Sequence, residues 1–85
     1  MYTNDLKKGD KVILSNGWLA TIMDNKKGTI RMAEVQGHYT EIGSVYAHDI
    51  AYAFTGVDGD TEKWDKVKHT DAQLKLKSTI SKMGF

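Results

Sequence analysis

Short apolar and polar runs that alternate with a period of two fill much of the first half of the chain. Such alternation is typical of a strand with one buried face. It predicts strands at residues 11–14, 18–24 and 29–35. Asn16-Gly17 separates the first two strands, and both residues tolerate the positive φ angles of a type I′ turn. We therefore expect an antiparallel hairpin that a third strand extends.

The second and third predicted strands have different patterns. Residues 18–24 are apolar on both faces, which is typical of a central, curved strand. In residues 29–35, Ile30 and Met32 alternate with Thr29, Arg31 and Ala33. We expect Ile30 and Met32 to face the core.

The sequence signals that follow residue 35 are weaker than those of the first three strands. They predict a fourth strand near residues 43–46, a one-turn helix at 47–50 and a fifth strand at 51–55. Residues 61–67 fit either a strand or a helix. We interpret them as a strand that pairs with the fifth one, with Trp64 as its main packing residue.

A capped helix is predicted at residues 70–83. Thr70 and Gln73 have the spacing of a capping box, and Gly84 stands where a helix commonly ends. One helical stripe is mainly apolar and should cover the barrel. The stripe contains Ala72, Leu76, Thr79, Ile80 and Met83.

Leu74 and Phe85 fall outside that stripe. They fit an exposed leucine and a frayed chain end, both of which are ordinary. They also fit a second apolar contact, either with a loop or with another copy of the chain. Leu74 and Phe85 are therefore the candidate self-association residues.

These elements predict a mainly β fold in a single domain, with an antiparallel barrel of five or six strands at residues 1–68 and a helix packed on it at 69–85. At 85 residues, the chain is near the lower limit for a domain that its core alone stabilises. It contains no cysteine, so disulfides and thiolate metal sites are excluded. The expected core residues are Val12, Leu14, Leu19, Ile22, Ile30, Met32, Val45, Ile50, Phe54, Trp64, Leu76, Ile80 and Met83.

The formal net charge is +1, but it is unevenly distributed. Residues 1–60 carry six basic and eight acidic side chains (net −2), and residues 61–85 carry six and three (net +3). The basic end fits a solvated helix face, and an anionic partner is the alternative. Because no secretory signal or long apolar run is present, we expect a cytoplasmic protein without a membrane partner.

The chain also resembles known small barrels. Gly9-Asp10-Lys11-Val12 is followed by Asn16-Gly17, a strand that ends at Ile22, and Gly28. This succession resembles the opening of KOW-type and YajC-type domains over residues 6–35. Together with the one-turn helix before the fifth strand, it implies an SH3-like barrel. The chain has Leu19-Ala20 where the KOW pattern has a second glycine, and it lacks the membrane helix of YajC-type proteins.

A second resemblance concerns the later part of the chain. Tyr46-Ala47-His48-Asp49-Ile50, Val67-Lys68-His69-Thr70 and Gln73-Leu74-Lys75-Leu76 are similar to segments of small uncharacterised proteins of tailed bacteriophages. The resemblance implies a bacteriophage origin and no particular chemistry.

No residues have the pattern of a catalytic centre. The four serines lie in no nucleophile motif, and His38, His48 and His69 lack the spacing of metal ligands. We interpret the histidines as turn residues bonded to the backbone or to water. No phosphate-binding glycine loop is present, so we expect a non-enzymatic protein without a cofactor.

Two functions from different classes remain. The first is an interaction module that binds a host or viral protein and can form a homo-oligomer. The second is an RNA- or DNA-binding barrel, since small barrels bind nucleic acid with strand-face aromatics beside basic loops. Packing at the barrel rim is the competing role of each tyrosine. The candidate nucleic-acid-binding residues are Lys26, Lys27, Arg31, Tyr39, Tyr46 and Tyr52.

Overall fold

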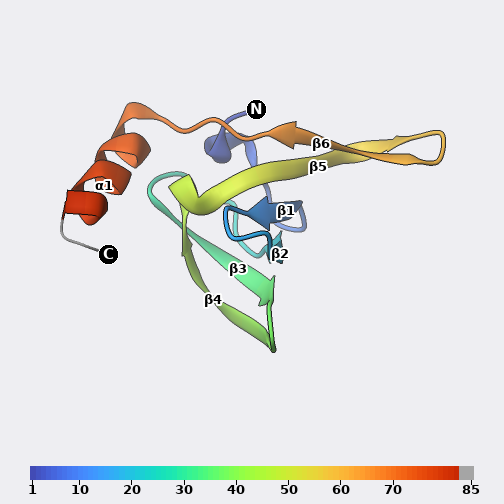
Figure 1. Cartoon of the computed structure of the whole chain (residues 1–85), viewed down its shortest axis with the longest axis horizontal. Coiled ribbons are helices and arrows are strands. Elements are labelled where there is room, and N and C mark those ends of the chain that lie inside the picture. The colour runs from blue at the N-terminus through green and yellow to red at the C-terminus, as the bar shows by residue number, and fades with distance from the viewer. Residues whose placement is uncertain (83–85) are drawn as a thin grey trace.

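The computed structural model describes residues 1–82, which form a six-stranded antiparallel sheet, two short 3₁₀ turns and a C-terminal helix (Figure 1). The strands are β1 (Lys11–Leu14), β2 (Leu19–Ile22), β3 (Ile30–Gln36), β4 (Thr40–Tyr46), β5 (Ile50–Asp58) and β6 (Thr61–Lys66). The helical elements are η1 (Thr3–Asp5), η2 (Ala47–Asp49) and α1 (Asp71–Lys82). The six predicted strands and the helix are confirmed, and β4 and β5 are longer than expected.

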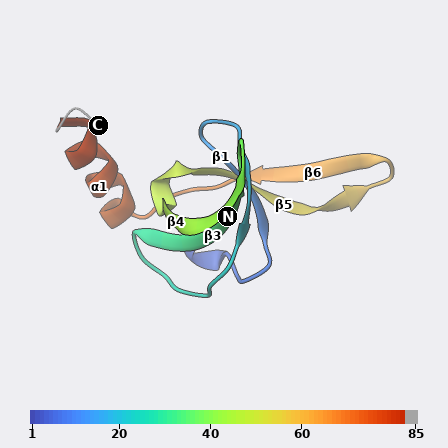
Figure 2. The same cartoon turned by 90° about the horizontal axis from the view of Figure 1, so that it is seen from below.

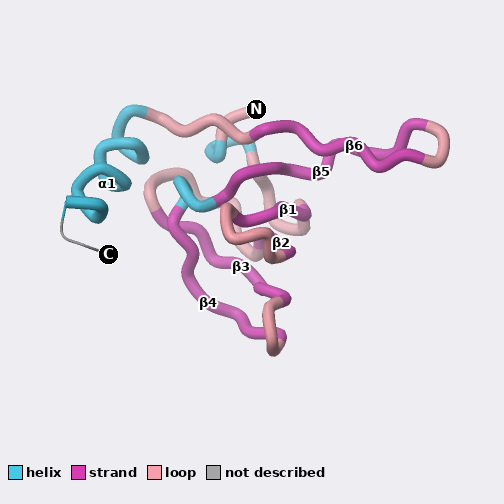
Figure 3. The backbone as a smooth tube through the Cα atoms, viewed as in Figure 1, coloured by secondary structure: helices cyan, strands magenta, loops and turns pink. Residues whose placement is uncertain are grey.

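The strands lie in the order β4-β3-β2-β1-β5-β6, with β1 paired to β5. β2 is central, as its pattern predicts. The sheet is not closed into a barrel, so that part of the prediction is not confirmed: β4 and β6 form its two edges (Figure 3). The β5–β6 hairpin and α1 project from opposite ends of the molecule (Figures 1 and 2).

The core lies on one face of the sheet. Val12, Ala20, Ile22 and Ala33 come from β1 to β3, and cross-strand pairing places them side by side. Val35 and Val45 pack against this cluster and are partly buried. The other buried core residues are Leu6, Leu14, Ile50, Ala53 and Val67.

Three expected core residues are wrong: Leu19, Ile30 and Met32 are all exposed. On β3 the inward face belongs to Arg31 and Ala33, the opposite of the expected phase. A shift of one residue moves every side chain of a strand to the other face. Each of the three guanidinium nitrogens of the buried Arg31 donates a hydrogen bond, which offsets the cost of burying the charge in this phase.

The remaining residues that were expected in the core are buried only in part or lie outside the described residues. Phe54 and Trp64 are partly buried and pack edge to face, with ring centroids 5.3 Å apart on the β5–β6 hairpin. Leu76 and Ile80 are half-buried on α1. Met83 lies outside the described residues, as do Gly84 and Phe85.

The turn between β1 and β2 is not of type I′. Gly17 has a φ of 91°, but no residue other than glycine has a positive φ among the described residues. Asn16 instead accepts a hydrogen bond from the Trp18 N–H at its side-chain oxygen, 3.1 Å away. The Leu14 N–H donates to the Trp18 carbonyl, and the Gly17 N–H donates to the Leu14 carbonyl. The loop therefore has three residues and ends with a left-handed glycine.

The capping box at the start of α1 is confirmed. The Gln73 N–H donates to Thr70 Oγ1 at 3.3 Å, and the Thr70 N–H donates to Gln73 Oε1 at 2.8 Å. The buried Gln73 amide also donates to the Gly28 carbonyl at 2.6 Å and to Asn4 Oδ1 at 3.3 Å. The main contact of α1 is with η2, so the helix lies at one end of the sheet (Figure 2).

Candidate functional site

The outer edge of β4 has no strand beside it in the described part of the chain. On its other side β4 pairs with β3 through seven consecutive residue pairs without a bulge. The Ala47 N–H donates to the Thr29 carbonyl at one end of this ladder, and the Gly37 N–H donates to the Tyr39 carbonyl at the other. Bonded and non-bonded pairs alternate in an antiparallel ladder. The backbone N–H and C=O groups that point to the open edge therefore belong to Thr40, Ile42, Ser44 and Tyr46.

The outer face of β3 and β4 is apolar. Ile30 lies opposite Tyr46, while Met32 and Ile42 lie opposite Ser44 and Glu34. The exposed fractions are 50% for Ile30, 41% for Met32, 64% for Ile42 and 42% for Tyr46. Contiguous exposed apolar residues are a common mark of an interaction surface. We call Ile30, Met32, Ile42 and Tyr46 the β3–β4 apolar face.

A small hollow adjoins this face at the edge of the sheet. It has a volume of about 180 Å³ and is lined by Ile30, Ser44, Val45 and Tyr46. It can therefore receive part of an apolar side chain from a segment that lies along β4.

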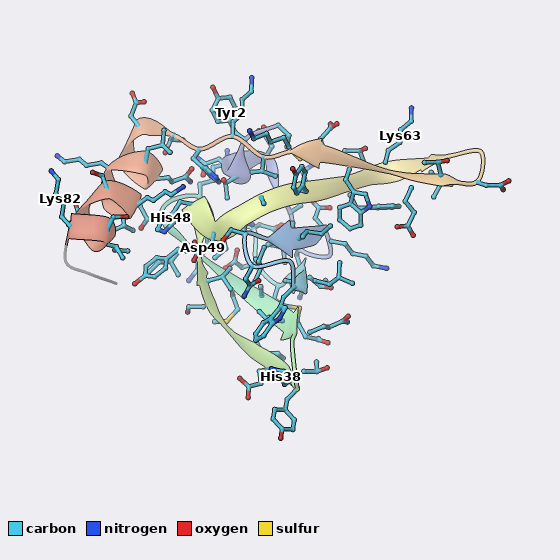
Figure 4. All side chains as sticks on the ribbon, viewed as in Figure 1. Tyr2, His38, His48, Asp49, Lys63 and Lys82 are labelled. Atoms are coloured by element: carbon cyan, nitrogen blue, oxygen red, sulfur yellow. The ribbon has the colours of Figure 1, made fainter. Side chains whose placement is uncertain are left out.

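A second hollow separates η2 from α1. It measures about 360 Å³ and lies where Tyr46 stacks on His48, with ring centroids 5.1 Å apart and planes 10° apart. His48 is buried, and its Nε2 is 3.7 Å from Asp49 Oδ1 (Figure 4). The lining residues are Tyr46, His48, Asp49, Lys77, Ile80 and Ser81.

The histidines do not assemble a metal site. His69 Nδ1 lies 3.0 Å from Thr3 Oγ1. Burial lowers the pKa of His69, and the neighbouring charges of His48 and Lys77 lower it further. Within residues 1–82, no three His, Cys, Asp or Glu side chains are grouped as metal ligands.

The structure removes Arg31 from the candidate nucleic-acid-binding residues, because its side chain is fully buried. Its Nε lies 2.8 Å from Asp24 Oδ1, and its terminal nitrogens donate to the Thr3 and Leu6 carbonyls at 2.9 Å each. An arginine bonded in this way cannot reach a phosphate without unfolding its surroundings. The interior position was not expected, because a lone arginine on an alternating strand is usually solvated.

The partner of Arg31 has a perturbed pKa. Burial raises the pKa of the Asp24 carboxyl, but several hydrogen bonds lower it by more. The Met32 N–H donates to Oδ2 at 2.8 Å, and Arg31 and the Lys26 N–H donate to Oδ1. The pKa of Asp24 therefore lies below its ordinary value.

The three candidate tyrosines do not form one stacking platform. Tyr46 ends β4 and Tyr52 lies on β5, and three strands separate β4 from β5. Tyr39 belongs to the loop that connects β3 and β4, beyond the Trp18–His38 ring contact. The three rings are exposed on different parts of the molecule.

Lys26 and Lys27 are exposed, and the fold brings a second pair of lysines beside them. The Lys8 N–H donates to Asn25 Oδ1 at 2.8 Å, which ties the segment after η1 to the β2–β3 loop. An open hollow of about 610 Å³ lies between the two segments. Sequence reasoning missed Lys7 and Lys8, since nothing local indicates that they approach a loop about twenty residues away. We call Lys7, Lys8, Lys26 and Lys27 the lysine cluster.

Self-association through Leu74 and Phe85 remains a prediction. Leu74 is exposed on α1, and Phe85 lies outside the described residues. The sequence patterns did not predict the open β4 edge, although one signal was present: residues 40–46 contain neither lysine nor proline, the usual protectors of an edge.

Comparisons of the chain with protein-family models, curated proteins and solved structures found no match. Among the described helices, none has the length and apolar content needed to cross a bilayer. The function is therefore argued from the surfaces described above.

Proposed function

We propose that this chain is a non-enzymatic interaction module that binds a protein by adding an extended strand of its partner to β4. The observation that carries the proposal is the unpaired edge of β4 beside the β3–β4 apolar face. In strand addition, main-chain hydrogen bonds supply affinity and alternate side chains supply specificity. The outward groups of Thr40, Ile42, Ser44 and Tyr46 offer such bonds along the whole strand.

The surroundings of β4 indicate which segment fits. Every second side chain of the added strand would continue the β3–β4 apolar face, so β-branched or aromatic residues are favoured there. One of them would enter the hollow of about 180 Å³ beside Tyr46. β4 itself carries a single charged residue, Glu41, so a weakly charged segment is favoured.

The wider setting of the proposal comes from the resemblances in the sequence. The strands and the 3₁₀ turn between β4 and β5 support an SH3-like architecture, to which β6 and α1 are additions. The bacteriophage-like segments support a host or viral protein in the cytoplasm as the partner.

Amide chemical shifts of the labelled chain test the proposal. The ligands are uncharged heptapeptides with Val, Ile or Thr at alternating positions, added at low protein concentration. We expect the shifts of Ile42 and Ser44 to move more than those of Gly43 and Val45, whose N–H groups already bond β3. Shifts confined to another surface, or none with any peptide, would contradict the proposal.

A matched pair of variants sharpens this test. Proline at position 44 removes an N–H that points to the open edge and leaves the β3 ladder intact. We therefore expect Ser44→Pro to lose peptide binding and Ser44→Ala to keep it. Equal binding by both variants would show that the peptide does not pair with β4.

A second function is supported by the lysine cluster. Lys7 and Lys27 line one open hollow, and Lys8 and Lys26 are their chain neighbours, so the arrangement favours an anionic polymer such as RNA or DNA. Asp5 lines the same hollow and reduces its positive charge, so we rank this function second.

Fluorescence anisotropy with short RNA and DNA tests the second function. Binding should weaken steeply with added salt, because phosphate contacts release counterions. Lys26→Glu with Lys27→Glu should abolish it, whereas Lys66→Glu, on a distant strand, should have a smaller effect. Absence of binding at low salt would remove this function.

A further inference from the structure

We infer that the strand accepted by β4 is β4 of a second copy of this chain, in an antiparallel two-fold register centred on Gly43. The inference rests on the proposed function, because it needs an edge that accepts a strand. It adds the identity of the partner and the register of the pairing.

The backbone groups of β4 define this register. Thr40, Ile42, Ser44 and Tyr46 point to the open edge, so they must face the corresponding residues of the second copy. With Gly43 on the axis, Ile42 faces Ser44 of the second copy, and Thr40 faces Tyr46 of the second copy. All outward groups of both strands then form bonds within the seven residues of β4. A register shifted by two residues leaves the end of each strand without a partner.

The charges of β4 are compatible with this pairing. Glu41 is the only charged residue of the strand, and it faces Val45 of the second copy. The two Glu41 side chains lie at opposite ends of the paired segment, about 14 Å apart at about 3.4 Å per residue. Solvent screens that distance, since the Debye length is about 8 Å at physiological ionic strength. No like charges oppose each other.

The side chains near the axis also favour a second copy. A Cβ added at Gly43 would meet no atom within 4 Å, so the fold accepts a side chain at the axis position. Ile42 of each copy becomes the diagonal neighbour of its equivalent, within reach of an apolar contact. The β3–β4 apolar faces of the two copies then form one continuous surface.

The expected dimer is weak. Stable protein interfaces bury about 1,200–2,000 Å² in total, and a single pair of seven-residue edges covers less. Association should therefore depend on concentration in sedimentation experiments. A mass that stays at 9.5 kDa at every concentration would overturn the inference.

Disulfide cross-linking tests the register, because the chain has no native cysteine. In the proposed dimer, Gly43 faces its equivalent in a non-bonded pair, with Cα atoms about 4.5 Å apart. That distance suits a disulfide, whereas the diagonal distance between the two Ser44 residues is too long, above about 7 Å. Lys66→Cys on the opposite edge of the sheet gives the background rate.

We expect Gly43→Cys to form the covalent dimer about tenfold faster than Lys66→Cys, because pairing raises the effective concentration. Ser44→Cys should react close to the background rate. Faster reaction of Ser44→Cys than of Gly43→Cys would overturn the register, and background rates for both would overturn the pairing.

Experiments can disprove the pairing of two copies without disproving the proposed function. Ser44→Pro should abolish the concentration dependence of the mass, and Ser44→Ala should preserve it. If the chain is monomeric but the peptides still shift Ile42 and Ser44, strand addition stands and the second copy is excluded. If neither occurs, both proposals fall.

Discussion

The two edges of the sheet are built differently. β4 has seven residues and one charge, whereas the six residues of β6 include four charged ones: Glu62, Lys63, Asp65 and Lys66. Charged side chains on an edge discourage the addition of another strand. The charges on β6 therefore protect one edge more than the other, which favours β4 as the site of the proposed strand addition.

The N-terminal segment covers the chain that follows β6. The Lys68 N–H donates to the Met1 carbonyl at 2.7 Å, and the Thr3 N–H donates to the Lys68 carbonyl at 3.0 Å. Tyr2 and Lys68 form a parallel bridge. The N-terminal segment thus lies beside the chain just after β6 and pairs with it at Lys68, and nothing comparable lies beside β4 in the described residues.

Loss of the buried arginine should have the largest effect on this arrangement. Arg31 binds the Thr3 and Leu6 carbonyls and so holds the N-terminal segment that covers the β6 side. We expect Arg31→Met to lower the free energy of unfolding by about 3–5 kcal/mol, since it leaves the Asp24 carboxylate without its buried partner. Urea denaturation gives the magnitude.

Lys27→Met is the control, because it also replaces a basic residue by methionine, at an exposed position. Its effect should stay within about 0.5 kcal/mol. Adding Asp24→Leu to Arg31→Met should recover part of the loss, because it removes the unpaired charge. A loss below about 1 kcal/mol in Arg31→Met would show that the interior bonds contribute little beyond their desolvation cost.

A charge placed on β4 should make its edge resemble β6. We expect Ile42→Lys to weaken strand addition by about tenfold, because it removes an apolar cross-strand contact and brings two like charges near the axis. Peptide titration and cross-linking of Gly43→Cys both measure this effect. Stability should change by less than about 0.5 kcal/mol, since the side chain is exposed.

The reverse change makes β6 more like β4. Replacing Glu62 and Lys66 by threonine removes charges from that edge. We expect greater light scattering at high protein concentration, because an edge with fewer charges accepts other strands more readily. Unchanged scattering, together with full strand addition by Ile42→Lys, would show that charge does not distinguish the two edges.

Local patterns predict the elements of this protein better than their faces. The period of two places the first three strands, and turn residues support the other three, although residues 61–67 also fitted a helix. The Thr70–Gln73 spacing identifies the helix start. The phase of β3 was wrong because Arg31 gains its partners from Asp24 and from the distant Thr3 and Leu6 carbonyls. No window around β3 contains those last two partners.

The candidate site depends on contacts of the same long-range kind. An edge is defined by the strand that is missing beside it, so the sequence of β4 predicts a strand but not its place at the border of the sheet. The lysine cluster likewise needs the bond between Lys8 and Asn25. The absence of lysine from residues 40–46 was the one local sign of an accessible edge.

Leu74→Lys separates the two surfaces proposed for self-association. Leu74 is exposed on α1, and α1 mainly contacts η2. If β4 forms the dimer, the variant should keep the cross-linking rate of Gly43→Cys and the concentration dependence of the mass. A mass reduced to that of the monomer by Leu74→Lys would assign the contact to the helix instead.

The smallest expected effect is a pH dependence on the β6 side. His69 follows the segment covered by Met1–Thr3, and its Nδ1 lies 3.0 Å from Thr3 Oγ1. Its pKa is lowered below the ordinary 6.5 by burial, then by His48 and Lys77, against a smaller opposite effect of Asp49. As the pH falls through about 6.5, the unfolded chain takes up a proton before the folded one, so the free energy of unfolding decreases.

Urea denaturation between about pH 7.5 and pH 5.5 measures how steeply the free energy of unfolding depends on pH. His69→Gln should flatten this dependence, because glutamine keeps a polar side chain and does not titrate there.

The lowered pKa of Asp24 acts in a separate, more acidic window below its ordinary 3.8, where the stability due to its ionised form is lost. His69 contacts Thr3 of the N-terminal segment, and Asp24 binds Arg31, which holds that segment. Acid should therefore speed amide exchange in the N-terminal segment and leave amide exchange along β4 unchanged. Equal loss of protection on both edges would mean that the N-terminal segment does not distinguish them.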